Sequence, residues 1–474
     1  MLIMPSLDAQ SSLPHYIQLY EYIKKEIIAG RLEVHDRLPS IRKLADFLSI
    51  STTPVEMAYQ QLLAEGFIES RPKSGYFVNE LPESYFTKIK NEVLNPLSFI
   101  EEEHSYLYDF HLSKNDFTLF PFQIWKRLYS QTLHKDSQEL LFYGNPQGEL
   151  GLRKAIARYL HDFRGVNCTP GQIIIGAEQH LLISIASRIL KKYTKIIAVE
   201  NPGYKLIPET FKHNGFSLCP LPLDDGGLNI EALYKSPARI AAVSPSHQFP
   251  RGMTMPISTR LKLLDWARIT QGFIIEDDYD GEFRYHGRPI PSLQGLAPDS
   301  RVIYIGGFSQ IVAPALCIHY LVLPDELLPH YHQLRIETMF EQSSSRLHQR
   351  VLQVFIEQGH LEKHIRKMRN IYRRKHDRII ESIKQHFGQK ARIIGKDAGF
   401  HLLLAINTNA SEKLLLELAA NAGIHISSAS FTWIDNPGGR IKEFFLGFAG
   451  IPFETIDDGI RLLKEVWDKL LEDF

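Results

Sequence analysis

Apolar residues near the start of the chain recur at the spacing of short helices. One stripe runs from Tyr16 to Ile27 and is followed by Gly30, a residue type that commonly ends a helix. A second, shorter stripe predicts a helix over residues 40–48. The first fifty residues therefore predict two helices of different length.

A third helix and a hairpin are predicted to follow. Thr53 has the type of an N-cap, Pro54 suits the first helical position, and Glu56 completes a capping box. The segment 66–78, GFIESRPKSGYFV, predicts two short strands around a Pro-Lys-Ser-Gly turn. Three helices followed by a small hairpin predict a winged helix-turn-helix over residues 1–79.

The pattern changes after the hairpin. Residues 80–107 mix Pro, Asn, Glu and Lys with scattered aromatics and show no period, which predicts an interdomain linker. From residue 108, short apolar runs alternate with helix-like stretches. This predicts an α/β domain over 108–474 with a mostly parallel sheet, helices on both faces and ligands at the carboxyl ends of the strands. A helical tract from about 340 to 388 opens a smaller C-terminal α/β subdomain. The candidate strands are 173–177, 195–200, 240–245, 273–278, 302–307 and 319–323.

Composition narrows the class of protein. The 474 residues are 44% hydrophobic and 23% charged, which is typical of a globular chain. There is no apolar run of membrane-spanning length and no basic, apolar leader, so we expect no membrane partner and no secretion. Three scattered cysteines favour a cytoplasmic location. The formal net charge is +0, so a nucleic-acid partner has to be argued from a local patch.

Three stretches of the first domain resemble the GntR family of regulators: PHYIQLYEYIKKEIIAGRL, DRLPSIRKLADFLSIS and VEMAYQQLLAEGFIESRPKSGYFV. The resemblance implies that the second helix, the third helix and the wing contact a double-stranded DNA operator. Hydroxyls and amides at a helix N-terminus can donate to phosphate, and Arg or Lys can contact phosphates or guanine edges. The DNA-binding residues that it implies are Arg42, Lys43, Ser51, Thr52, Thr53, Arg71, Lys73 and Gly75.

The domain departs from the family pattern in its charge. Thr52 stands where family members usually have an arginine, and residues 1–80 hold 8 Lys+Arg against 10 Asp+Glu. One interpretation is a winged domain kept for protein contacts. Local clustering of basic residues favours DNA binding instead. The cluster consists of Arg37, Arg42, Lys43, Arg71 and Lys73.

The remainder of the chain resembles fold-type I enzymes that use pyridoxal phosphate (PLP), and specifically the aminotransferase-like half of MocR-type regulators. The segments that carry the resemblance are LFPFQIWKRL, YGNPQGELGLRKAIARYL, VENPGY, SPSHQFPRGMTMP, EDDYDGEFRY and IYIGGFSQIVAPAL. The resemblance implies a homodimer, since such proteins build their pocket at a subunit interface, and a domain that senses a small-molecule effector.

The expected cofactor pocket is degenerate. Asp277 and Tyr279 match the family's positions for the pyridine nitrogen and the phenol oxygen. Gln310, 33 residues after Asp277, stands at the position of the Schiff-base lysine, and an amide nitrogen is not nucleophilic. Cys317 replaces an arginine that is common in the family seven residues after the lysine position, and Phe445 replaces the family's substrate-binding arginine. Glu178 places a carboxylate in the phosphate turn, where the family usually has glutamine. The pocket residues that we expect are Ala177, Glu178, Tyr204, His247, Asp277, Tyr279, Ser309, Gln310, Cys317 and Phe445.

These replacements predict a transcription regulator that is not an enzyme and has no cofactor. Gln310 excludes covalent PLP, and we expect no noncovalent PLP. The alternative is a regulator that binds PLP noncovalently, or an aminotransferase-like enzyme that uses another residue, because Asp277 and Tyr279 remain.

The chain's histidines form no convincing metal-ligand motif, so no metal site is expected. His360, His364 and His376 fall in a basic helical segment, and we expect them at a solvated surface. Residues 361–378 hold 8 Lys+Arg and 2 acids, which predicts an amphipathic helix with a charged face. A contact of this helix with DNA is the alternative.

Overall fold

The chain divides into two compact units, residues 1–103 and 104–474, which are described separately. A computed structural model describes residues 7–8, 11, 13–81, 106–112, 115–285, 287, 290–297, 301–339, 343–396, 398–435 and 438–474. Most of the predicted linker, 80–107, lies outside these residues, so the domain boundaries stay a prediction. In the described part of the chain, no helix is both long and apolar enough to cross a membrane.

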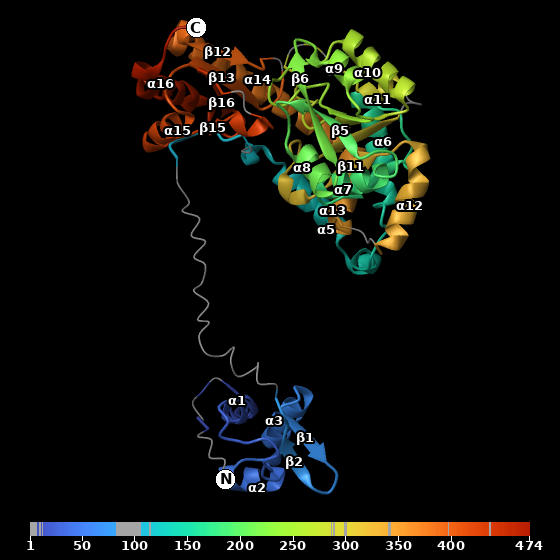
Figure 1. Cartoon of the computed structure of the whole chain (residues 1–474), viewed down its shortest axis with the longest axis vertical. Coiled ribbons are helices and arrows are strands. Elements are labelled where there is room, and N and C mark those ends of the chain that lie inside the picture. The colour runs from blue at the N-terminus through green and yellow to red at the C-terminus, as the bar shows by residue number, and fades with distance from the viewer. Residues whose placement is uncertain are drawn as a thin grey trace. The chain divides into compact units, whose positions relative to one another are not determined.

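The first unit is the winged helix-turn-helix that the sequence predicts (Figure 1). Its hairpin pairs Ile68 with Val78 and Arg71 with Gly75 in antiparallel register. The turn between the strands places Lys73 at φ +63° and Gly75 at φ +116°. The elements are α1 (His15–Ile28), α2 (Ile41–Leu48), α3 (Thr52–Ala64), β1 (Ile68–Arg71) and β2 (Gly75–Val78).

The helix starts differ in one respect from the prediction. At α2, the Ser40 hydroxyl accepts a hydrogen bond from the Lys43 amide, 3.3 Å away. At α3, Ser51 is the N-cap and no side chain caps the helix, so the predicted capping box of Thr53 and Glu56 is wrong. Both residues lie within the helix, because it begins one residue before Thr53, and both side chains are exposed.

The predicted apolar stripes do form the core of this unit. Each helix contributes the face that its spacing predicts, and strand residues close the core from the other side. The buried residues of the three helices are Leu19, Tyr20, Ile23, Ile27, Leu44, Ala45, Val55, Ala58, Tyr59 and Leu62.

The second unit is built on an eight-stranded sheet in the order β4-β11-β10-β9-β8-β5-β6-β7. The five strands from β10 to β6 are parallel, while β11 and β7 run antiparallel to their neighbours. The mostly parallel α/β sheet is thus confirmed. All six candidate runs became strands, and β6 and β7 were not foreseen. The strands are β4 (Ile173–Gly176), β5 (Ile196–Asn201), β6 (Ser217–Asp224), β7 (Gly227–Leu228), β8 (Ile240–Val243), β9 (Phe273–Asp277), β10 (Val302–Gly307) and β11 (His319–Val322).

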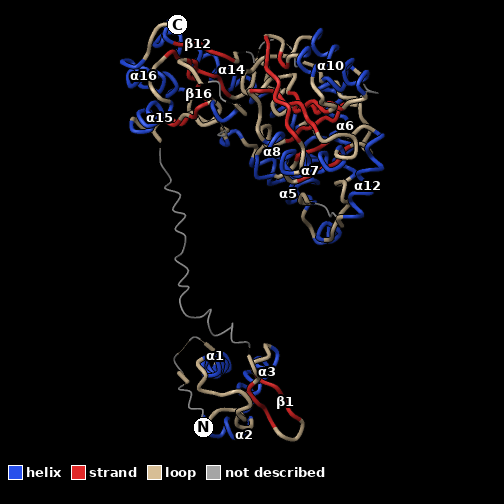
Figure 2. The backbone as a smooth tube through the Cα atoms, viewed as in Figure 1, coloured by secondary structure: helices blue, strands red, loops and turns tan. Residues whose placement is uncertain are grey.

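Helices cover both faces of this sheet, with the strands in the middle (Figure 2). Alternation along β9 shows the division, because Phe273 and Ile275 pack in the core under α7 and α8 while Ile274 packs under α9 and α10. The strands are buried on both faces, which explains their continuous apolar runs. The helices are α6 (Leu150–Arg164), α7 (Gln179–Leu190), α8 (Leu206–His213), α9 (Ile230–Lys235), α10 (Ile257–Thr270), α11 (Leu293–Leu296) and α12 (Leu328–Glu337).

A second, antiparallel sheet of four strands, in the order β12-β13-β16-β15, belongs to the C-terminal part of this unit. A short β3 pairs in parallel with β14. The long helical tract is two helices separated at Gly359, whose φ is +72°. The elements are β3 (Tyr108–Asp109), α5 (Phe122–Thr132), α13 (Arg346–Glu357), α14 (His360–Phe387), β12 (Ala391–Ile394), β13 (His401–Asn407), α15 (Glu412–Asn421), β14 (Ile424–His425), β15 (Ser427–Ser428), β16 (Ile441–Gly447) and α16 (Ile456–Trp467).

Helix α14 corrects the prediction for two histidines. His364 and His376 are buried, not solvated, because they lie on the same face as the apolar stripe of this helix. The ring Nε2 of His376 lies 2.7 Å from the carbonyl oxygen of Lys396. Part of the basic charge is also used internally, since buried Lys375 donates to Asp116 Oδ2 at 3.1 Å and to the Ala449 carbonyl at 2.8 Å.

Candidate functional site

The first unit presents a polar surface around the start of α3. Ser51, Thr52 and Thr53 are exposed at this N-terminus, where free amides and the helix dipole favour an anion. Arg42 and Lys43 are exposed on α2. This surface can hold a phosphate backbone through donors and positive charge together.

The wing adds a second group of exposed charges. Arg71 already has partners within the wing, because its Nη2 lies 2.6 Å from Glu69 Oε1 in an ion pair and its guanidinium lies 4.5 Å from the centre of the Phe77 ring. Lys73 stands at the tip of the turn and is exposed. Within the described residues, Arg42, Lys43 and Lys73 make no ion pair, so their charge is available to a ligand. Gly75 turns the chain beside Arg37, whose Nε would lie 3.4 Å from an added Cβ.

The second unit contains a cavity of about 500 Å³ at the carboxyl ends of β9 and β10 and the start of α7. This is the place where ligands bind in parallel sheets of this kind. Six of the ten predicted pocket residues line the cavity: Glu178, Tyr204, Asp277, Tyr279, Ser309 and Gln310.

The other four predicted residues lie outside the lining. His247 is buried behind Tyr279, and its Nδ1 lies 2.9 Å from both the Tyr279 hydroxyl and Asp280 Oδ2. Phe445 is buried and stacks on Phe249, with 5.4 Å between the ring centres. Ala177 donates its amide to the Ser343 hydroxyl at 3.1 Å. Cys317 is exposed and does not line the cavity.

Asp277 is the buried acid of the cavity. Its Oδ1 accepts a hydrogen bond of 2.8 Å from Gln179 Nε2, while Oδ2 has no partner among the described residues. Burial raises the pKa of this carboxyl to about 7, and the nearby carboxylates of Asp278 and Asp280 act in the same direction. A carboxyl of this kind can accept from, or give a proton to, a basic ligand near neutral pH.

Gln310 and its neighbours make a neutral wall. The Gln310 Oε1 accepts a hydrogen bond of 3.0 Å from Asn115 Nδ2. The Ser309 hydroxyl lies 2.8 Å from His319 Nε2, and Nδ1 of the same ring lies 3.1 Å from the Ala177 carbonyl. Burial lowers the pKa of His319, which keeps this ring neutral. In the part of the lining that the structure describes, no residue is a lysine or an arginine.

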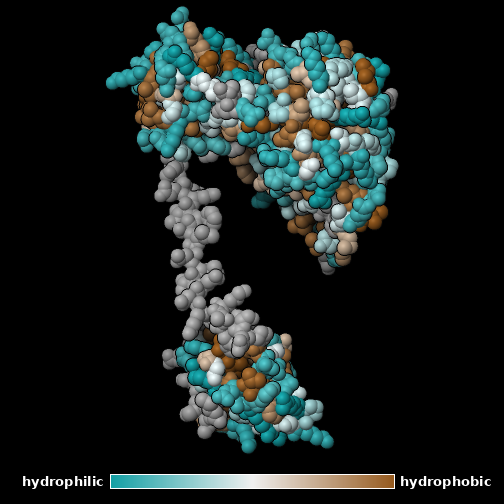
Figure 3. Space-filling model, viewed as in Figure 1, coloured by the Kyte–Doolittle hydropathy of each residue, from teal (hydrophilic) through white to brown (hydrophobic). Residues whose placement is uncertain are grey.

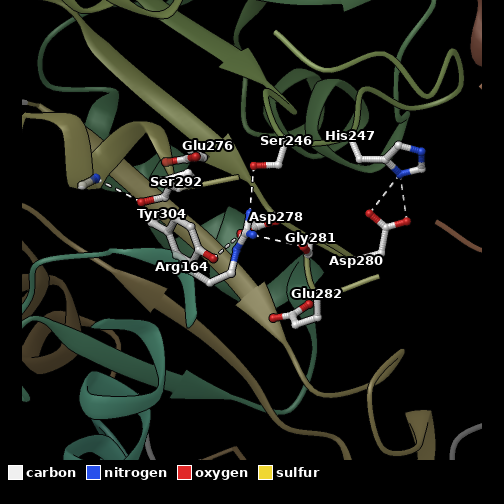
Figure 4. A network of polar contacts seen from close by, with 12 residues as sticks. Arg164, Ser246, His247, Glu276, Asp278, Asp280, Gly281, Glu282, Ser292 and Tyr304 are labelled. Carbon is white, nitrogen blue, oxygen red and sulfur yellow. Dashed lines mark hydrogen bonds and ion pairs between the residues drawn. The ribbon is translucent and has the colours of Figure 1, made fainter. Parts of the chain in front are cut away.

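Arg164 holds the segment that follows β9, through Asp278 and Gly281 (Figure 4). Its fully buried guanidinium donates to Asp278 Oδ2 at 2.6 Å, to the Ser246 hydroxyl at 2.8 Å and to the Gly281 carbonyl at 3.0 Å. The Tyr304 hydroxyl donates to the same Asp278 oxygen. The network ties the end of β9 to the loop after β8 and to α6.

Several residues of the cavity were not foreseen from the sequence. Gln179 directly follows Glu178 in the motif GAEQH, so its position was available as a signal. The sequence gave no signal for Phe249, which lies in a loop, or for His401, which begins the apolar strand β13. The unforeseen lining residues are Leu112, Gln179, His180, Leu206, Phe249, His319, Phe400, His401 and Phe431.

Each of the two units matches a known protein family. Residues 15–78 match the family described as bacterial regulatory proteins, gntR family, and residues 109–443 match aminotransferase class I and II. The chain is 40% identical to the uncharacterized HTH-type transcriptional regulator YdeL of Bacillus subtilis, over 98% of this chain and 99% of the relative. It is 32% identical to the probable rhizopine catabolism regulatory protein MocR of Rhizobium meliloti, over 97% and 95%.

The second unit also has the fold of solved aminotransferases. A multiple substrate aminotransferase from Thermococcus profundus superposes with a TM-score of 0.70 at 23% identity, covering 82% of this chain and 97% of that protein. The chain therefore belongs to the GntR family of bacterial regulatory proteins, as a MocR-type transcription regulator that joins a winged helix-turn-helix to an aminotransferase class I and II domain.

Proposed function

We propose that this regulator binds an operator through its winged domain and that its aminotransferase-like domain senses a ligand without catalysing a reaction. The observation that carries the first half is the free positive charge of Arg42, Lys43 and Lys73 around an open helix N-terminus. Phosphate contacts of this kind supply affinity, and the hydroxyls of α3 together with Arg42 are placed to contact base edges. A regulator of this kind works beside the chromosome, so we place it in the cytoplasm.

The observation that carries the second half is the neutral amide of Gln310 in the cavity wall. Its oxygen accepts a hydrogen bond from Asn115, and the lining residues that the structure describes offer no amine that could take its place as a nucleophile. Without an amine, a carbonyl cofactor has no group with which to form a Schiff base. The domain is therefore proposed to be non-catalytic.

The same lining argues against PLP as a resident cofactor. One feature fits it: the partnerless Oδ2 of Asp277 could accept from a pyridinium nitrogen. The phosphate end does not fit, because the described lining residues include no Lys or Arg and the exposed carboxylate of Glu178 stands at the start of α7. Because the Asp277 carboxyl fits the pyridine ring of PLP, noncovalent PLP binding stays the second candidate. The described lining offers no cation for the phosphate, so this candidate is the weaker one.

The large unit is proposed to form a homodimer. Three consecutive large apolar side chains are strongly exposed: Leu141 at 73%, Phe142 at 73% and Tyr143 at 82%. Ile336 and Met339, near the end of α12, are also exposed. Figure 3 shows apolar surface at the lower tip of this unit. Contiguous exposed apolar surface is typical of protein interfaces, and two-fold symmetry suits an operator with two half-sites.

Two experiments test the proposal. Fluorescence anisotropy of a fragment of the gene's own promoter should show that Arg42→Ala weakens binding by about 1–3 kcal/mol, the scale of one good base or phosphate contact. Lys25→Ala, which removes an exposed charge from α1, is the matched control and should bind like the parent. Equal binding by all three proteins would move the winged domain toward a role in protein contacts.

The second experiment tests the non-catalytic domain. After incubation with PLP and reduction with borohydride, mass spectrometry should find no adduct on a cavity residue. A stoichiometric adduct there would overturn the proposal. Gln310→Lys should not become an efficient aminotransferase, because Cys317 and Phe445 supply no anion-binding group.

A further inference from the structure

The cavity of the second unit is bounded by carboxylates, neutral acceptors and aromatic rings. Among the described residues that line it, Glu178 and Asp277 are acidic and none is a lysine or an arginine. The buried guanidinium of Arg164 does not line the cavity and donates to Asp278 Oδ2 at 2.6 Å. The fixed charge around the cavity is therefore negative.

Two buried acceptors at the cavity have no partner among the described residues: Oδ2 of Asp277 and Nε2 of His401. A neutral imidazole ring carries a lone pair on one of its two nitrogens, and Nε2 can accept a hydrogen bond in the tautomer whose proton is on Nδ1. Burial lowers the pKa of His401 to about 3, and the ring stays neutral at physiological pH. Buried polar atoms in native proteins nearly always find a partner, and both of these atoms require a donor.

The field around Asp277 comes from acids on neighbouring elements. Asp278 and Asp280, in the same loop, both raise the pKa of Asp277. Glu200, at the end of β5, is itself buried next to Asp277, and burial raises its pKa to about 8. A positively charged donor would relieve this repulsion, whereas an anion would add to it.

Aromatic rings form the apolar part of the wall. Phe249, Phe400 and Phe431 line the cavity, and Tyr204 packs edge-on against Phe249 with 5.7 Å between ring centres. Phe445 backs this wall by stacking on Phe249. Ring faces attract organic cations and pack well against apolar bodies.

We propose that the cavity binds a small organic cation, a protonated amine or nitrogen heterocycle on an apolar or aromatic body, with its N–H groups on Asp277 and its body against the Phe249 wall. The volume of about 500 Å³ suits a molecule of small-metabolite size. The role of this cation as the effector of DNA binding rests on the proposed function, but its binding can be measured without DNA.

The test is isothermal titration of the full chain at pH 8, where the Asp277 carboxyl is mostly ionised. The probes are 2-phenylethylammonium, the anion 3-phenylpropionate, the neutral 3-phenylpropan-1-ol, and PLP. The cation should bind at least about 10-fold more tightly than each other probe. Asp277→Asn should weaken cation binding by about 10- to 100-fold, the range for a hydrogen bond to a charged group. Asp225→Asn, which removes an exposed carboxylate from the β6–β7 turn, should leave it unchanged.

A second variant separates charge from folding. Gln310→Lys places a cation in the wall and should weaken binding of the ammonium probe while its thermal unfolding stays cooperative. Four results would overturn the proposal: no cation binding in the millimolar range, tighter binding of 3-phenylpropionate or PLP, unchanged binding by Asp277→Asn, or unchanged binding by Gln310→Lys. Promoter binding of the same proteins, measured by anisotropy, reports on the proposed function separately, so either result can fail alone.

Discussion

Replacing Arg164 by methionine should destabilise the large unit and loosen the loop that carries Asp277. Arg164 is fully buried, and its guanidinium makes hydrogen bonds to Asp278, Ser246 and Gly281. Removing one partner of a buried ion pair leaves the other charge without compensation, which costs about 3–5 kcal/mol. For a unit of roughly 370 residues, an unfolding entropy of about 2.1 cal/mol/K per residue turns this cost into a fall in Tm of about 4–6 °C.

The assay is thermal unfolding monitored by scanning calorimetry, and Arg158→Met is the matched control. Arg158 is exposed on the same helix, so its replacement should shift Tm by less than about 1 °C. The double variant Arg164→Met with Asp278→Asn should recover part of the loss, because the uncompensated charge is gone. Equal Tm values for Arg164→Met and Arg158→Met, or strictly additive effects in the double variant, would refute the reasoning.

Four further outcomes are expected. Lys73→Ala should weaken specific and nonspecific DNA alike and lower the slope of log affinity against log salt by about one unit, measured by anisotropy across a salt series. Thr52→Arg should tighten binding in the same assay by adding a phosphate contact. Burial raises the folded-state pKa of Asp277 to about 7, so the stability that its protonated form contributes is lost as pH rises through that value. The parent should lose up to about 1.4 kcal/mol of unfolding free energy per pH unit in this way. Asp277→Asn does not titrate at this position, so its Tm relative to the parent should be higher at pH 8 than at pH 6. Phe142→Ser should shift the light-scattering mass from dimer toward monomer, and a parent protein that is monomeric at micromolar concentration would contradict the proposed interface.

The fold was predictable because its signals are local. Continuous apolar runs predicted six of the eight strands of the large sheet, and helical spacing predicted the three helices of the winged domain. The exact start of α3 was not predictable, since Ser51, Thr52 and Thr53 are all residue types that favour the N-cap position. In the structure the N-cap is Ser51. The strands β6 and β7 escaped because β6 alternates apolar residues with prolines and is only partly buried.

Only those residues of the cavity that lie in recognisable family motifs were predictable from the sequence. Asp277, Tyr279 and Gln310 line the cavity as the resemblance implies, whereas Cys317 is exposed outside the lining and Phe445 packs behind Phe249. The rest depends on contacts between distant segments. The burial of His364 and His376 followed from helix spacing and was missed because charge dominates their segment. The cavity position of His401 requires β13 to meet the end of β9, and no local pattern states this.

The most direct test of the account is the affinity of the full-length protein for its own promoter fragment against a scrambled fragment of equal length, measured by fluorescence anisotropy at 150 mM salt. We expect a saturable complex that is at least about 10³-fold tighter on the promoter, as is usual for specific regulators. Equal affinity for the two fragments, or no binding to either, would contradict the claim that this chain is an operator-binding regulator.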